Sequence, residues 1–144
     1  MKMKKTVMMI VMVLAVTCGA VEVPERLLDA IAKVESNNNP RAEEDRDKNG
    51  NPRAIGMYQI WKIYVDDVNR MSSKKFTYED RWDARKSREM VRIYIEFYSR
   101  HYKRTTGKEA TVEVMARIHN GGPSGWRKDA TRSYWRKIKA AGRF

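Results

Sequence analysis

The chain has 144 residues, of which 30 are Lys or Arg and 18 are Asp or Glu, so its formal net charge at pH 7 is +12. This length suits one domain with its own hydrophobic core and is too short for two ordinary domains. A single cysteine and two distant histidines, His101 and His119, exclude an internal disulfide and leave too few ligands for a zinc cluster, so we expect no metal and no cofactor.

The first twenty residues have the pattern of a secretory signal peptide. A start with three lysines is followed by the uncharged residues 6–20, which end in the small residues Cys18-Gly19-Ala20. This uncharged run is shorter than the roughly 20 apolar residues that a helix needs to span a bilayer. We expect cleavage near Ala20 and a secreted or periplasmic domain of residues 21–144, with lipidation of Cys18 as the alternative.

Removal of residues 1–20 leaves 27 basic and 18 acidic residues, a net charge of +9, and no cysteine. Packing alone must then hold the fold together. A basic exported domain is attracted to anionic bacterial surfaces or to nucleic acid, and charge alone does not choose between them.

The apolar residues of this domain recur mostly at helical spacing. Leu27, Leu28, Ile31 and Val34 predict a first helix that starts near Pro24 and stops at Asn37-Asn38-Asn39-Pro40. Four more helices are predicted, over residues 58–70, 82–103, 111–119 and 131–141. The helix over residues 82–103 is apolar nearly all round, so we expect it to form the buried centre of the domain.

Residues 41–55 are polar and contain Asn49-Gly50, a dipeptide typical of tight hairpin turns. Asp45 to Gly50 also match the first half of a calcium loop, but Gly56 stands where that loop needs a bidentate Glu. We therefore expect a hairpin here, and an α+β fold that is mainly α, with about five helices and one small β-hairpin.

Glu35 lies near the end of the first predicted helix and on its apolar side, four positions after Ile31 and seven after Leu28. A carboxyl group in this place must either pair with a cation or be partly buried. A partly buried carboxyl group can keep its proton near neutral pH and give it to a leaving oxygen. Glu35 is therefore a candidate general acid, and a salt bridge to Arg41 or Arg53 is the structural alternative.

Several blocks of residues resemble the lysozyme-like superfamily. Val34-Glu35-Ser36, Asn39-Pro40 and Gly56-Met57-Tyr58-Gln59-Ile60 are similar to the E-S, N-P and G-x-x-Q-I pattern of goose-type lysozymes and soluble lytic transglycosylases. Residues 116–125, Ala-Arg-Ile-His-Asn-Gly-Gly-Pro-Ser-Gly, followed by Tyr134-Trp135, closely resemble the invertebrate-type lysozymes, whose pattern there is A-R-I-H-N-G-G-P-x-G. These blocks spread over most of the domain, so the resemblance implies a lysozyme-like fold.

Carried over residue by residue, the resemblance implies that Glu35 is the general acid and that Tyr58 and Gln59 line a sugar cleft. His119 and Asn120 would face the same cleft from the opposite wall. The structural alternatives are that Gln59 only fixes a loop and that His119 is an interior histidine.

The invertebrate-type family also has an aspartate about a dozen residues after its Glu. Asp47 stands twelve positions after Glu35 and is the candidate second carboxylate, with Asp45 as its competitor and a solvated turn residue as the structural alternative for Asp47. Two carboxylates about 5 or about 8 Å apart permit retaining or inverting hydrolysis, and with one carboxylate the sugar itself must assist. The cysteines of that family are absent here, and the loop before Gly56 is longer.

The resemblance implies a monomeric muramidase that cleaves the β-1,4 bond between N-acetylmuramic acid and N-acetylglucosamine in peptidoglycan glycan strands. Its alternatives are a lytic transglycosylase, which forms 1,6-anhydro products, and a wall-binding protein without catalysis. A nucleic-acid-binding module is the alternative of another class, because the basic helices on either side of residues 120–125 are similar to a helix-turn-helix. Export and a Glu at the end of a helix have no part in such a role, so we expect no nucleic-acid partner.

Overall fold

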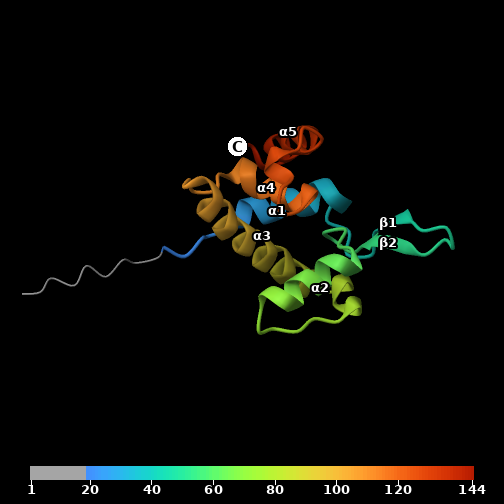
Figure 1. Ribbon diagram of the computed structural model, residues 1–144. Helices are drawn as coiled ribbons and strands as arrows, with labels where there is room; N and C mark the ends of the chain where they lie inside the picture. The colour runs from blue at the N-terminus through green and yellow to red at the C-terminus, as the bar shows by residue number, and fades with distance from the viewer. Residues whose placement is uncertain (1–18) are drawn as a thin grey trace, which may run out of the picture.

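The computed structural model describes residues 19–144, so the signal peptide predicted for residues 1–20 lies almost wholly outside the described residues. Five α-helices and a two-stranded antiparallel sheet confirm the predicted fold class (Figure 1). The elements in chain order are α1 (Glu25–Ser36), β1 (Glu43–Arg46), β2 (Pro52–Ile55), α2 (Lys62–Met71), η1 (Tyr78–Trp82), α3 (Ala84–Thr106), α4 (Val112–Gly121), η2 (Gly125–Arg127) and α5 (Thr131–Gly142). None of the helices in residues 19–144 is long and apolar enough to cross a membrane.

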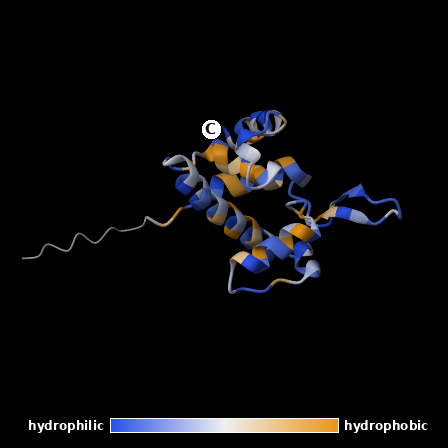
Figure 2. Ribbon diagram, viewed as in Figure 1, coloured by the Kyte–Doolittle hydropathy of each residue, from blue (hydrophilic) through white to orange (hydrophobic). Residues whose placement is uncertain are grey.

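Helix α3 runs through the middle of the fold. Helix α2 packs on one side of it, whereas α1, α4 and α5 form a second group that packs on the other side (Figure 1). Apolar residues gather where these groups meet (Figure 2). Met90, Val91 and Ile95 of α3 are fully buried there, but Ile93 and Phe97 are only half-buried. The helix is therefore buried along one side and not all round, because no further element covers its outer face among the described residues.

The end of α1 is fixed in a way that matters for Glu35. Asn37 closes the helix in a left-handed conformation, with φ +56°, and its N–H donates to the carbonyl of Lys33. The Ser36 hydroxyl donates to the carbonyl of Met57 across 2.8 Å. The last turn of α1 is thus tied to the segment that follows β2, which brings two of the resembling blocks together.

The predicted hairpin is present and extends from the body of the molecule (Figure 1). Its register pairs Glu43 with Ile55 and Glu44 with Ala54. The turn at its end is closed by Asp47, whose Oδ1 accepts hydrogen bonds from the backbone N–H groups of Asn49 at 2.8 Å and Asn51 at 2.9 Å.

Helix α2 begins at Lys62, four residues later than the apolar spacing predicts. Residues 55–60 instead form a tight turn, in which the N–H of Ile60 donates to the carbonyl of Ile55 across 3.0 Å. Gly56 has a φ of +80° in this turn, and a Cβ atom there would lie 2.0 Å from the carbonyl oxygen of Arg81. Only glycine allows this conformation and this close backbone approach.

Candidate functional site

A pocket of about 350 Å³ lies where the two helical groups meet the base of the hairpin. Residues of both strands, of helices α1, α2, α3 and α4 and of the turn before α2 line it. Its polar lining residues are Glu35, Glu44, Asp45, Gln59, Tyr64, Asp67, Tyr94, His119 and Asn120.

Glu35 lies in the wall of this pocket, with 19% of its side chain exposed. The hydroxyl of Tyr134 donates to Glu35 Oε1 across 2.7 Å, and His119 Nε2 lies 3.5 Å from the same oxygen. The salt bridge considered from the sequence is not present, since Glu35 has no Lys or Arg partner within residues 19–144. Both contacts engage Oε1, so a proton on Oε2 can face a bound molecule.

Tyr134 holds Glu35 from the side of α5. It lies in the first turn of that helix and is 8% exposed. Burial, followed by the negative charge of Glu35, raises the pKa of Tyr134 well above its ordinary value. The phenol therefore keeps its proton and serves Glu35 as a hydrogen-bond donor.

His119 connects Glu35 to a second phenol, that of the partly buried Tyr64. His119 Nδ1 lies 3.1 Å from the hydroxyl of Tyr64, and only 5% of the histidine side chain is exposed. Burial raises the pKa of Tyr64 well above its ordinary value, so this phenol also stays protonated. When Tyr64 donates to Nδ1, the proton of the neutral imidazole sits on Nε2 and points toward Glu35.

Residues 56–60 and residues 116–125, which carry the resemblance to lysozymes, both contribute to the pocket, but one of the predicted lining residues does not line it. Asn120 lines the pocket beside His119. Gln59 also lines it, and its Nε2 donates to the carbonyls of Gly56 at 2.9 Å and Ala42 at 3.3 Å, so it fixes the loop as well. Tyr58 is 1% exposed, and its hydroxyl accepts from Arg88 across 2.9 Å. The structure places Tyr58 in the core and not in the pocket wall.

The candidate second carboxylates lie in different places. Asp47 lines a separate pocket near the end of the hairpin, and hydrogen bonds from the backbone of Asn51 and Asn49 lower its pKa. Asp45 lines the same pocket as Glu35, and its carboxylate accepts from Arg53 across 2.9 Å. Glu44 also lines that pocket. The structure therefore brings Asp45 and Glu44, and not Asp47, to the pocket that contains Glu35.

The sequence analysis missed two residues that contact the core of the site. It did not single out Tyr64, which falls within the predicted helix over residues 58–70, because the spacing of an inward-facing tyrosine does not differ from that of a leucine. Tyr134 was noted only within the resembling block. Each of these helices has a tyrosine on its inward side, and the hydroxyl of such a tyrosine needs a hydrogen-bond partner. This requirement could have predicted a polar group nearby.

The pocket is lined by acidic side chains, whereas the whole chain is basic. Besides Glu35, the carboxylates of Glu44, Asp45 and Asp67 line it and no Lys or Arg does, although Asp45 pairs with Arg53 and Asp67 pairs with Arg70. Such a site favours a molecule that gains positive charge as it reacts. A partly buried carboxyl group beside other carboxylates suits the cleavage of a glycosidic bond.

Comparisons with known proteins agree with this geometry. The family model described as Destabilase matches residues 24–141. The chain is 29% identical to a lysozyme of Ostrea edulis over 140 residues, which cover 97% of this chain and 96% of the relative. It is 37% identical over 92 residues to invertebrate-type lysozyme 3 of Caenorhabditis elegans, which cover 60% of this chain and 66% of that protein.

Solved structures give the same result. The crystal structure of Tapes japonica lysozyme matches with a TM-score of 0.64 and 27% identity, over 81% of this chain and 88% of the other. The inhibitor-bound lysozyme of Meretrix lusoria matches with a TM-score of 0.63 and 28% identity, over 82% and 89%. The chain therefore belongs to the Destabilase family, the family of the invertebrate-type lysozymes.

Proposed function

We propose that the pocket hydrolyses the β-1,4 bond between N-acetylmuramic acid and N-acetylglucosamine in peptidoglycan, with Glu35 as the proton donor. One observation carries this proposal: a partly buried carboxyl group in the pocket wall has its Oε1 held by Tyr134 and His119, and neither of these contacts uses Oε2. The lysozyme relatives support the substrate class.

The reaction follows from the properties of the glycosidic bond. Glu35 gives the proton of Oε2 to the bridging oxygen, the bond from that oxygen to the sugar C1 breaks, and positive charge spreads over C1 and the ring oxygen. Carboxylates in the pocket stabilise that charge. Water then adds to C1, and the proton that it releases returns to Glu35.

We assign the second carboxylate to Asp45 and not to Asp47. Asp45 lines the pocket with Glu35, and Arg53 fixes its orientation. Asp47 closes the hairpin turn with both carboxylate oxygens, which accept from Asn49 and Asn51. The aspartate twelve residues after Glu35 is thus assigned a structural role here.

The remaining site residues divide between contact with sugar and positioning. Gln59 and Asn120 are proposed to contact the glycan from opposite walls of the pocket. His119 acts on Glu35 through Nε2, and Tyr64 acts through His119, so both are positioning residues. Tyr58 supports the fold by its hydrogen bond with Arg88.

We also propose that residues 1–20 are removed on export and that residues 21–144 act as a secreted or periplasmic monomer. The lysine-rich start and uncharged run of residues 1–20 support export. An enzyme that acts on peptidoglycan must reach the cell wall, and a basic protein is attracted to its anionic surface.

Incubation with purified peptidoglycan tests the proposed function. We expect the suspension to clear while new reducing ends appear in proportion. Binding without the release of soluble fragments would contradict the proposal and indicate a wall-binding protein. The comparisons with lysozymes favour catalysis over that alternative.

Tyr134→Phe is expected to lower the rate of hydrolysis about tenfold, because it removes the only O–H that donates to Glu35 Oε1 among the described residues. Loss of that bond leaves the carboxyl group less firmly oriented toward the bridging oxygen.

Tyr102→Phe is the matched control, since Tyr102 packs against Trp126 outside the pocket. It should leave the rate unchanged. A Tyr134→Phe variant that hydrolyses peptidoglycan at the wild-type rate would show that this phenol does not act on the proton donor.

A further inference from the structure

The outer face of α5 carries a row of cations, Arg132, Arg136 and Lys139, and Arg143 follows directly after the helix; we call these four residues the α5 stripe. The three helical cations follow one another at steps of four and three positions, so at about 100° per residue their side chains fall within about 60° of one another. All four residues are exposed. At a rise of about 1.5 Å per residue, the three helical cations span about 10 Å, with a cation every 5 to 6 Å.

The α5 stripe has few counter-charges. Helix α5 contains no Asp or Glu. Arg132 pairs with Asp129 across 3.1 Å in a highly exposed pair, whereas the other three side chains have no ion-pair partner within residues 19–144. By contrast, the cations of α3 that face α1 are neutralised, because Arg88 and Arg92 both pair with Glu25.

The stripe faces away from the pocket. On the same helix, Tyr134 points inward to Glu35, and at about 100° per residue it lies nearly opposite the stripe. The outward side of α5 is accordingly hydrophilic (Figure 2). A molecule bound along the stripe can therefore leave the pocket free for a glycan strand.

We propose that the α5 stripe binds a linear phosphodiester polymer of the bacterial wall, of the poly(glycerol phosphate) class. A chain with one negative charge per repeat, separated by three-carbon units, can place successive phosphates beside successive cations. Duplex DNA carries its phosphates on two strands that border each groove, so a protein that binds it needs cations along both strands and not one row of them. This inference rests on the proposed function, which places the protein at the wall where such polymers are linked to peptidoglycan.

The stripe would raise the local concentration of enzyme at its substrate. The protein would bind the same wall at two places, the pocket and α5. Once one of them is bound, the other is held close to its own ligand, so the two modest interactions together bind more tightly than either alone. Hydrolysis of whole walls should then depend on the stripe, whereas hydrolysis of short soluble glycans should not.

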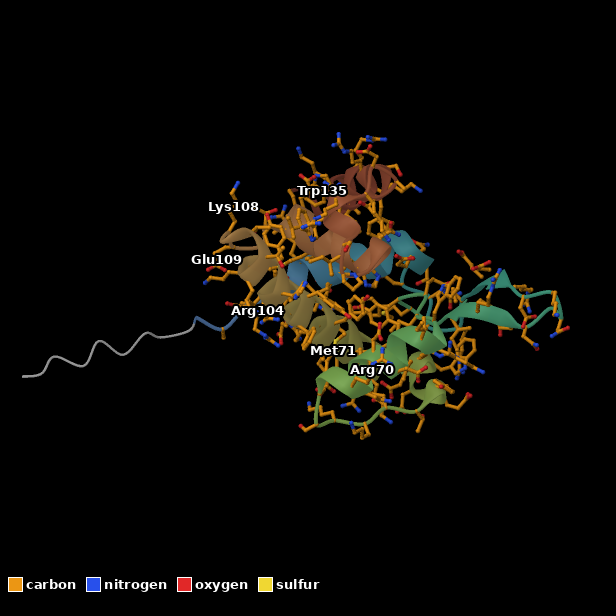
Figure 3. All side chains as sticks on the ribbon, in the orientation of Figure 1. Arg70, Met71, Arg104, Lys108, Glu109 and Trp135 are labelled. Carbon is orange, nitrogen blue, oxygen red and sulfur yellow. The ribbon has the colours of Figure 1, made fainter. Side chains whose placement is uncertain are left out.

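The test compares two triple variants that remove the same charge from different places. Arg136→Gln/Lys139→Gln/Arg143→Gln changes the stripe, and Arg100→Gln/Arg104→Gln/Lys108→Gln changes exposed cations at the far end of α3. Figure 3 labels Arg104 and Lys108 at that end and Trp135 on α5. Binding of lipid-free poly(glycerol phosphate) to the wild-type protein and both variants is measured at several salt concentrations.

We expect the stripe variant to bind at least about tenfold more weakly, and its slope of log K against log salt to fall by about 2, since each contact with a single strand contributes about 0.7. The α3 variant should stay near wild type. Equal weakening in both variants would overturn the proposal, because net charge alone would explain it. Equal dependence on the stripe for duplex DNA or for phosphatidylglycerol vesicles would also overturn it.

Hydrolysis of short soluble glycans separates this inference from the proposed function. Both variants should cleave such oligomers at the wild-type rate. A wild-type protein that binds the polymer through the stripe but cleaves no glycan would contradict the proposed function alone.

Discussion

Glu35→Gln is expected to lower hydrolysis of peptidoglycan by about 10²- to 10⁴-fold, the range that a positioned proton donor typically contributes. The amide keeps the size of the side chain and still offers an oxygen to the Tyr134 hydroxyl, which donates to Oε1 in the wild-type protein. It cannot give up a proton to the bridging oxygen. The loss should therefore appear in kcat while the affinity for the glycan stays close to wild type.

Glu44→Gln is the matched control, because Glu44 also lines the pocket and the substitution makes the same change of side chain. Thermal unfolding of both variants, followed by circular dichroism, should match that of the wild type. A fully active, folded Glu35→Gln variant would remove Glu35 from the mechanism.

Asp45→Asn is expected to lower the rate by about 10²-fold, because the positive charge on the sugar loses an anionic partner whose orientation is fixed. The structural reason is that Asp45 lines the pocket and Arg53 holds its carboxylate across 2.9 Å. Asp47→Asn should retain most activity, since Asp47 lines another pocket. Its effect should instead be a lower melting temperature, because an amide accepts the hydrogen bonds of the turn less strongly than a carboxylate.

Both expectations are checked by initial rates of the two variants on one preparation of peptidoglycan. The rates are corrected for the folded fraction of each variant. An active Asp45→Asn enzyme together with an inactive Asp47→Asn enzyme would contradict the assignment. The twelve-residue spacing between Glu35 and Asp47 would then identify the second carboxylate correctly. In that case the hairpin would have to bring Asp47 to the pocket when a glycan binds.

The helices were predictable because each buries one side and exposes the other. In α1, Leu27, Leu28 and Ile31 recur at helical spacing and are all fully buried, and the helix stops at the run of asparagines as predicted. The hairpin was predictable from Asn49-Gly50, since Gly50 adopts a φ of +82° that few other residues accept. Local rules were sufficient in these places.

The start of α2 was not predictable from apolar spacing, because long-range contacts decide it. Gly56 lies against the backbone of Arg81, and Ile60 pairs with Ile55, so the residues before Lys62 form a turn that periodicity does not reveal. The position of Tyr58 depends on the same turn. Its side chain points into the core toward Arg88, whereas its neighbour Gln59 lines the pocket.

The site itself was predicted in part. Glu35, His119 and Asn120 come together in one pocket as the resembling blocks implied. Their supporting phenols could not be found from spacing, since Tyr134 is 99 residues from Glu35 in the chain and only the packing of α1 against α5 brings them together. The second carboxylate was left between Asp47 and Asp45, because the length of the hairpin decides which aspartate reaches the pocket.

The mass of the products made in water labelled with heavy oxygen tests the central claim most directly. Hydrolysis must add one solvent oxygen at the newly formed reducing end of N-acetylmuramic acid, because water attacks C1. We predict reducing-end fragments that each carry one heavy oxygen, formed by the wild-type protein and not by the Glu35→Gln variant. Unlabelled fragments that are lighter by one water would contradict hydrolysis and identify a lytic transglycosylase, and labelled fragments from the Glu35→Gln variant at the wild-type rate would contradict the role of Glu35.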